Sequence, residues 1–333
     1  MSNRKWNIGI AILFIIFACL LASFLQSTIN IRTLLQPAHS DPGTESEATT
    51  KHIVLISQEL DNPYWRSIEE GAIEAALKYG MQLEYVGPLR INSSEQSQLL
   101  EKAIAAKADA VLVQGINDPK YIALIDEAIE EGIAVLTIDT DEQGSRRLSY
   151  VGTNNFDAGV AMGELVAKAA RNRGDVAVLI GNEQSPNQQL RLAGFRSVLS
   201  QLPEMTLVDV RSSNISRLQA AGETEKLLIQ NPQINFMVGL SALDGIGISE
   251  AAQRLRRSGL QIFAFDALEE TVERVRSGAI HSTIVQQPYD MGYAAISQLN
   301  DYFLGKQLPE HFFTKVTLLG SDELKRSMGD ADS

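Results

Sequence analysis

Polar and aromatic residues follow several short apolar segments of this sequence, and their side chains have the chemistry of ligand contacts. Carboxylates and amides make directional hydrogen bonds, and Tyr and Trp rings cover apolar surface. Almost no nucleophile stands beside a base at these positions, so the residue types favour binding over catalysis, and no catalytic residue is expected. The candidate ligand-binding residues are Asn62, Tyr64, Trp65, Gln114, Asp139, Asp141, Gln189, Arg191, Ser241, Asp266 and Gln286.

The segments that must position these residues alternate between strand-like and helix-like patterns from residue 52 onward. A helix is expected over 63–79, because Pro63 suits a first turn and Gly80 suits a helix end. Continuous apolar strands separated by helices predict parallel sheets that are covered on both faces. The expected strands are 53–57, 83–86, 110–114 and 134–139 in a first set, then 176–180, 206–210, 235–240, 262–265 and 282–285.

Two successive sets of strands predict an α/β protein with two doubly wound, Rossmann-like lobes. In such sheets, ligands bind outside the carboxyl ends of the strands. All the candidate residues except Arg191 follow the expected strands, so we expect them to lie near one another.

The N-terminal segment predicts a location outside the cytoplasm. Arg4 and Lys5 precede a stretch without charge from Trp6 to Ile31, which is long enough to cross a bilayer. We expect a membrane anchor or signal segment at 1–30 and a linker at 31–51, with the folded part on the extracytoplasmic side of the cell membrane. Cys19 leaves a second possibility open, a lipoprotein that is cleaved and lipidated at this residue.

Composition excludes several classes of protein. The 333 residues carry a net charge of -12, which disfavours nucleic acid as a partner. A single cysteine allows neither an intrachain disulfide nor a zinc site built on paired cysteines. The four histidines are scattered, and no metal or cofactor is expected.

The segment 60–65, LDNPYW, resembles the loop after the first strand of ribose-type sugar-binding proteins. Four later segments resemble the same family in the same order. They are TID at 137–139, RLAGF at 191–195, AFD at 264–266 and TIVQQP at 283–288. The sequence therefore resembles the periplasmic binding proteins of type I, and the segment TIDTD is similar to the galactofuranose-like and xylose-sensing branches.

This resemblance implies a ligand cleft between two lobes of a domain that spans 52–320. The first lobe would comprise about 52–153 plus 288–310, the second about 154–287, and 321–333 would be a tail. By position, the residues that match sugar contacts of the family are Asn62, Tyr64, Trp65, Asp139, Asp266 and Gln286. Gln189 and Ser241 stand where ribose binders have arginine and asparagine, so the resemblance implies a monosaccharide without specifying which one.

Seven of the eleven candidate residues also have a structural interpretation. An aspartate after a strand often caps the next helix, which applies to Asp139 and Asp266. The other structural interpretations are a helix start for Asn62, packing on the sheet for Tyr64 and Trp65, a pairing with a nearby acid for Arg191, and a satisfied strand end for Gln114.

Alternative functions differ in what they require of the sequence. A glycosidase would need two carboxylates beside one bond, a role open to Asp139 and Asp266, but no nucleophile elbow, phosphate loop or metal motif supports an enzyme. A repressor of this fold would begin with a basic DNA-binding motif, where this chain has an apolar stretch. The family resemblance leaves two membrane partners open, a sugar permease of an ABC transporter and a sensor histidine kinase.

Overall fold

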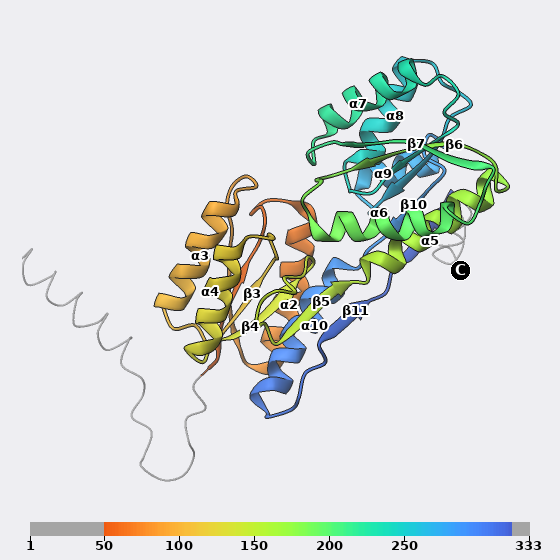
Figure 1. Ribbon diagram of the computed structural model, residues 1–333. Helices are drawn as coiled ribbons and strands as arrows, with labels where there is room; N and C mark the ends of the chain where they lie inside the picture. The colour runs from red at the N-terminus through yellow and green to blue at the C-terminus, as the bar shows by residue number, and fades with distance from the viewer. Residues whose placement is uncertain (1–49, 322–333) are drawn as a thin grey trace, which may run out of the picture. The chain divides into compact units, whose positions relative to one another are not determined.

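Two six-stranded sheets form the framework of the computed structural model, which describes residues 50–321 (Figure 1). The first sheet has the order β11-β5-β4-β3-β1-β2, and all its strands run parallel. The second has the order β12-β10-β9-β8-β6-β7, and only its edge strand β12 runs antiparallel to its neighbour. The strands of the first sheet are β1 (His52–Ile56), β2 (Gln82–Val86), β3 (Ala110–Val113), β4 (Ala134–Ile138), β5 (Ser149–Thr153) and β11 (His311–Thr314). Those of the second are β6 (Gly174–Ile180), β7 (Met205–Ser212), β8 (Phe236–Gly239), β9 (Gln261–Phe265), β10 (Ser282–Val285) and β12 (Thr317–Gly320).

Helices cover both faces of each sheet. Side chains alternate along β1, so that Ile53 and Leu55 join one core while Val54 and Ile56 join the other. The first sheet packs against α2 (Pro63–Tyr79) and α10 (Pro288–Phe303) on one face, and against α3 (Ser93–Ala105) and α4 (Pro119–Glu130) on the other. The second packs against α5 (Asn155–Ala170) and α6 (Pro186–Leu199) on one face, and against α7 (Arg217–Gln230), α8 (Asp244–Arg254) and α9 (Glu269–Arg276) on the other. The expected two-lobe α/β fold with parallel sheets is confirmed.

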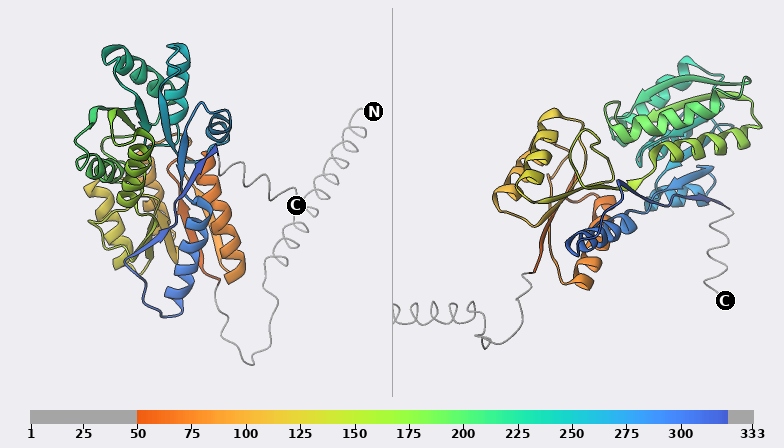
Figure 2. Two further views of the ribbon diagram at one scale, coloured as in Figure 1. Left: turned by 90° about the vertical axis from the view of Figure 1, so that its right-hand side faces the viewer. Right: turned by 60° about the horizontal axis from the view of Figure 1, so that its bottom comes forward.

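The chain passes between the two sheets three times within residues 50–321 (Figure 1). The first crossing follows β5, and the second leads from β10 to α10, which lies beside α2 (Figure 2). The third crossing is the short connection from β11 in the first sheet to β12 in the second.

The helix that carries the first candidate residues has the bounds expected from the sequence. The Asn62 side chain caps α2 by accepting a hydrogen bond of 3.0 Å from the Tyr64 amide. Pro63 occupies the first turn, and Gly80 ends the helix in the left-handed region at φ 67°.

Glycines allow neighbouring helices to approach closely on each sheet. A Cβ atom at Gly71 of α2 would lie 2.0 Å from the carbonyl oxygen of Tyr289, the residue that follows Pro288 in α10. A Cβ atom at Gly194 of α6 would lie 2.0 Å from the carbonyl oxygen of Phe156 in α5. Each pair of helices therefore packs backbone to backbone.

The expected anchor at 1–30, nearly all of the linker at 31–51 and nearly all of the tail at 321–333 lie outside the described residues. Between residues 50 and 321, no helix combines the length and the apolar character that crossing a bilayer requires.

Candidate ligand-binding cleft

Two aspartates occupy equivalent places in the two sheets. Asp139 directly follows β4 and Asp266 directly follows β9, and both have φ 65° in the left-handed region. The two backbone amides donate to the neighbouring strands, at 3.0 Å to Val151 and 2.7 Å to Ile284. Few non-glycine residues adopt this conformation, and aspartate is among those that adopt it most readily.

Neither aspartate side chain caps a helix in the described part of the chain. The strand β5 follows Asp139 with no helix in between, and the helix α9 begins after Leu268. The capping interpretation is therefore wrong for both residues, and both carboxylates face a cavity.

Nine of the eleven candidate residues line one cavity of about 90 Å³. They come from both lobes, which is the arrangement expected from the strand ends. These nine are Asn62, Tyr64, Trp65, Gln114, Asp139, Arg191, Ser241, Asp266 and Gln286.

Asp139 is held by donors from three neighbouring residues. The Tyr64 hydroxyl donates to its Oδ1 atom at 2.8 Å, and the Gln114 amide donates to its Oδ2 atom at 2.8 Å. The Thr140 hydroxyl donates to the same Oδ2 atom at 3.1 Å. Burial, and next the charge of Asp139, raise the pKa of Tyr64 well above its usual value, so this hydroxyl stays a donor. The Oε1 atom of Gln114 is buried and has no hydrogen-bond partner among residues 50–321.

Asp266 is buried among groups of the second lobe. The Gln286 side-chain amide donates to its Oδ1 atom at 2.9 Å. Burial raises the pKa of Asp266 above its usual value, and the positive charge of Arg191 opposes that rise. The Arg191 charge and the Gln286 hydrogen bond therefore favour the ionised form, which burial disfavours.

Arg191 is only 2% exposed, and its guanidinium group is already engaged within the protein. It donates to the Oδ1 atom of Asn155 at 2.8 Å, to the carbonyl oxygen of Leu240 at 2.9 Å and to the Oε1 atom of Gln286 at 2.9 Å. Its plane also lies over the Phe265 ring, 3.9 Å from the centroid. Arg191 thus has a structural role, but none of these three partners is the acid that the structural interpretation expected; Gln286 lies between Arg191 and Asp266.

The first crossing between the sheets is bonded to both sides of the cavity. The Thr153 hydroxyl donates to the Oε1 atom of Gln286 at 2.8 Å. The Tyr150 hydroxyl lies 2.8 Å from the carbonyl oxygen of Asp139 and 3.1 Å from that of Thr153. The end of β5 therefore links the backbone of Asp139 to Gln286, whose side-chain amide bonds to Asp266.

Asn62 and Trp65 line the cavity and also have structural roles. Asn62 caps α2, as described above, and Trp65 is 2% exposed within the hydrophobic core of the first lobe. The Trp65 ring meets Tyr64 edge-on, with centroids 6.5 Å apart. The two rings form an apolar wall beside the polar groups.

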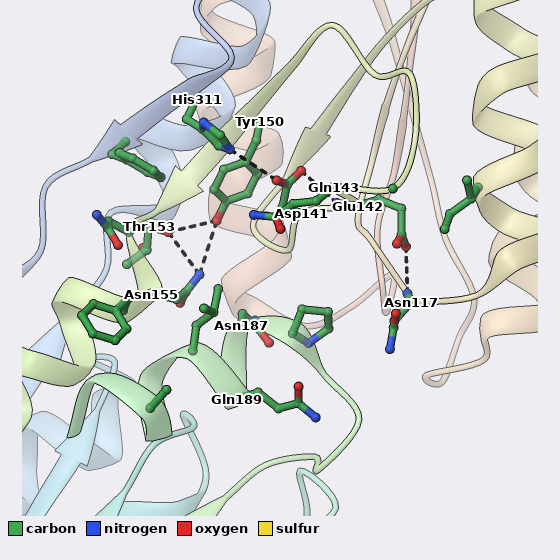
Figure 3. A pocket seen from close by; sticks show the side chains of 18 residues that line it. Asn117, Asp141, Glu142, Gln143, Tyr150, Thr153, Asn155, Asn187, Gln189 and His311 are labelled. Atoms are coloured by element: carbon green, nitrogen blue, oxygen red, sulfur yellow. Dashed lines mark hydrogen bonds and ion pairs between the residues drawn. The ribbon is translucent and has the colours of Figure 1, made fainter. Parts of the chain in front are cut away.

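The other two candidates, Asp141 and Gln189, line a separate cavity of about 790 Å³ (Figure 3). Asp141 accepts hydrogen bonds from Arg147 at 2.6 Å and from Thr137 at 2.7 Å, so it has partners within the protein. Gln189 is exposed, and its side chain donates to the carbonyl oxygen of Glu183 at 2.6 Å. The structure does not bring these two residues together with the other nine.

Gln188, which was not among the candidates, lines the cavity of the two aspartates instead of Gln189. It is 5% exposed, and its Oε1 atom accepts a hydrogen bond of 3.2 Å from the Gly181 amide. Successive helical residues are rotated by about 100°, so Gln188 shares a face with Arg191 while Gln189 points elsewhere. The helix start at Pro186 fixes this phase and could have revealed Gln188.

A model of the periplasmic binding protein domain matches residues 53–307, which include both lobes. The chain belongs to the periplasmic binding protein family. The ribose import binding protein of Bacillus subtilis is 24% identical over 86% of this chain and 92% of its own length. The expected membership in the ribose-type, sugar-binding branch is thereby confirmed.

Solved structures of this family resemble the chain closely. GanP, a glucose-galactose binding protein from Geobacillus stearothermophilus, is 37% identical with a TM-score of 0.80, over 83% of this chain and 99% of that protein. A chain in the XylFII-LytSN complex is 34% identical with a TM-score of 0.77, over 82% of this chain and 99% of that one. Both similarities extend over nearly the whole described region.

Proposed function

We propose that this periplasmic binding protein binds a neutral monosaccharide between its two lobes, in the cavity that contains Asp139 and Asp266. The observation that carries the proposal is the position of these two carboxylates. Each has a left-handed backbone conformation at the carboxyl end of a strand, one in each sheet, and both line the same cavity.

The chemistry of the cavity suits the hydroxyl groups of a sugar. The carboxylates accept hydrogen bonds from hydroxyls, and an ionised acceptor makes such bonds stronger. Arg191 is 2% exposed and uses three of its five N–H donors within the protein, so it offers little to an anionic ligand. The ring of Tyr64 and the edge of Trp65 supply the apolar surface that C–H faces of a sugar would cover.

Binding is proposed to close the two lobes about the three crossings. A ligand that contacts Asp139 in one lobe and Asp266 in the other is bound best when the lobes approach each other. Periplasmic binding proteins are a general precedent for this motion, because their domains close about a hinge around the ligand. Thr153 and Gln286 bond to each other beside the crossings, and we expect this hydrogen bond to change when the lobes close.

The proposed location is the extracytoplasmic face of the cell membrane, with residues 1–30 as the anchor. Delivery to a permease of an ABC transporter is the first candidate role, and the ribose import binding protein among the relatives supports it. Signalling through a membrane sensor is the second, and the assembly of XylFII with LytSN supports it. Recovery of the native protein from the membrane fraction with an intact N-terminus is expected, and a shed form that begins beyond Gln26 would contradict the anchor.

Calorimetric titration of the purified full chain in detergent micelles with a panel of neutral pentoses and hexoses tests the binding proposal. At least one sugar should bind, and Asp266→Asn should weaken it by roughly 10- to 100-fold, because a hydrogen bond to a charged group contributes about 1.5–3 kcal/mol. Asn tolerates the left-handed backbone, so the substitution isolates the charge.

The matched control is Asp141→Asn, which removes a carboxylate from the separate cavity. Its sugar affinity should stay within about twofold of the wild-type value, because Asp141 does not line the cavity of the two aspartates. Equal losses in the two variants would refute the assignment of the site. A panel in which no sugar releases heat or protects the fold would refute the proposed function.

A further inference from the structure

A second polar cavity, of about 390 Å³, adjoins the cavity of the two aspartates. Gln58 and Ser185 line both cavities, so the two spaces are neighbours. Gln58 follows β1 in the first lobe, and Ser185 is the residue before α6 in the second. One polar residue from each lobe therefore stands at the border between the two cavities.

The lining of the adjoining cavity is rich in uncharged hydrogen-bonding groups. Amides and hydroxyls come from Gln58, Asn92, Gln96, Asn182, Gln184 and Ser185. Among the described residues that line it, none is charged. Amide and hydroxyl groups both donate and accept hydrogen bonds, as the hydroxyls of a neutral sugar do.

Gln96 is the observation that points to a ligand. Its side chain lines the cavity and is 1% exposed, and its Nε2 atom has no hydrogen-bond partner within residues 50–321. An unpaired buried donor destabilises a fold, so native proteins seldom retain one. An acceptor supplied by a bound molecule would satisfy this N–H group.

We propose that the adjoining cavity accepts a second sugar residue, so that the site of the monosaccharide also accommodates a neutral disaccharide or longer glycoside; this inference rests on the proposed function. One ring lies beside Asp139 and Asp266, and the glycosidic linkage passes between Gln58 and Ser185. The second ring lies in the larger space, where one of its oxygens accepts a hydrogen bond from Gln96. A charged second residue is disfavoured because the cavity wall offers it no counter-charge.

Titration of the full chain with matched sugars tests the inference. The probes are glucose with cellobiose, galactose with galactobiose, xylose with xylobiose and arabinose with arabinobiose. At least one disaccharide should bind about tenfold more tightly than its monosaccharide. Gln96→Met should reduce that disaccharide's affinity by roughly 3- to 10-fold, the effect of one neutral hydrogen bond, and change the monosaccharide's affinity by less than about twofold.

Gln184→Ala provides a second variant that does not depend on the core, because Gln184 is exposed at the cavity rim. It should also weaken only the disaccharide. Monosaccharides that bind at least as tightly as their disaccharides, or equal losses for both sugars in Gln96→Met, would overturn the second subsite and leave the proposed function in place. Failure of every probe, monosaccharides included, would overturn both.

Discussion

Replacement of Arg191 by Met should destabilise the fold strongly. The side chain is 2% exposed and donates three hydrogen bonds, to Asn155, Leu240 and Gln286. Three bonds at about 0.5–1.5 kcal/mol each account for roughly 1.5–4.5 kcal/mol, and the contact with the Phe265 ring adds about 1 kcal/mol. We expect the free energy of unfolding at pH 7.5 to fall by about 3–5 kcal/mol.

The size of this loss should depend on pH because of Asp266. Burial raises the pKa of Asp266 in the folded protein, so its ionisation costs stability as the pH rises from the unfolded pKa toward the folded one. Arg191 opposes that cost in the wild type. The difference in stability between wild type and Arg191→Met should therefore be smaller at pH 4.5, where a larger fraction of Asp266 is protonated in the folded protein, than at pH 7.5.

Urea unfolding followed by far-ultraviolet circular dichroism at both pH values measures these differences. Arg196→Met is the matched control, because Arg196 lies on the same helix and its side chain is exposed. The control should change stability by less than about 0.5 kcal/mol. Two results would refute this account, in which Arg191 offsets the cost of ionising the buried Asp266 carboxyl. One is a loss of stability below about 1 kcal/mol in Arg191→Met, and the other is an equal loss at the two pH values.

Three further substitutions have defined outcomes in the same unfolding assay. Gly194→Ala should cost about 1–3 kcal/mol, because its Cβ atom would lie 2.0 Å from the Phe156 carbonyl oxygen and α5 must move. Gly222→Ala should leave stability unchanged or raise it by up to about 1 kcal/mol, because nothing lies within 4 Å of its Cβ position in α7; a loss as large as that of Gly194→Ala would contradict the explanation from close helix packing. Asp141→Asn should lower stability by about 1.5–3 kcal/mol, because the Arg147 side chain is 6% exposed and loses its charged partner; an unchanged urea midpoint would show that this pair contributes nothing.

Much of the fold could be predicted because its signals are local. Pro63 and Gly80 mark the ends of α2, and the apolar segments of β1, β3 and β4 are continuous. The strand β5 escaped prediction because its sequence, SYVGT, has no apolar run, although all five residues are buried. Its strand conformation depends on pairing with β4 and β11, and this pairing is not visible in the sequence of β5 itself.

Two of the four edge strands, β11 and β12, were missed for a similar reason. The segments of β11 and β12 are four residues each, and they pair with different sheets. Only contacts with β5 and β10 decide that the chain crosses between them. No local pattern in the sequence specifies this third crossing.

The candidate site was predictable where a residue directly follows a strand. Asp139, Asp266 and Gln286 lie at strand ends, and the rule for doubly wound sheets located all three. Gln188 was missed because its position depends on the phase of a helix whose start had not been assigned. Asp141 lies only two residues beyond Asp139, but the left-handed turn at Asp139 directs the chain to another cavity.

The backbone at Asp139 and Asp266 also restricts how this protein can evolve. At φ 65°, glycine, asparagine and aspartate are accommodated far more readily than other amino acids. A saturation library at either codon should therefore return these three amino acids among well-folded clones. Descendants that acquire a new ligand should do so by altering neighbours such as Gln114 and Gln286, whose backbones impose no such restriction.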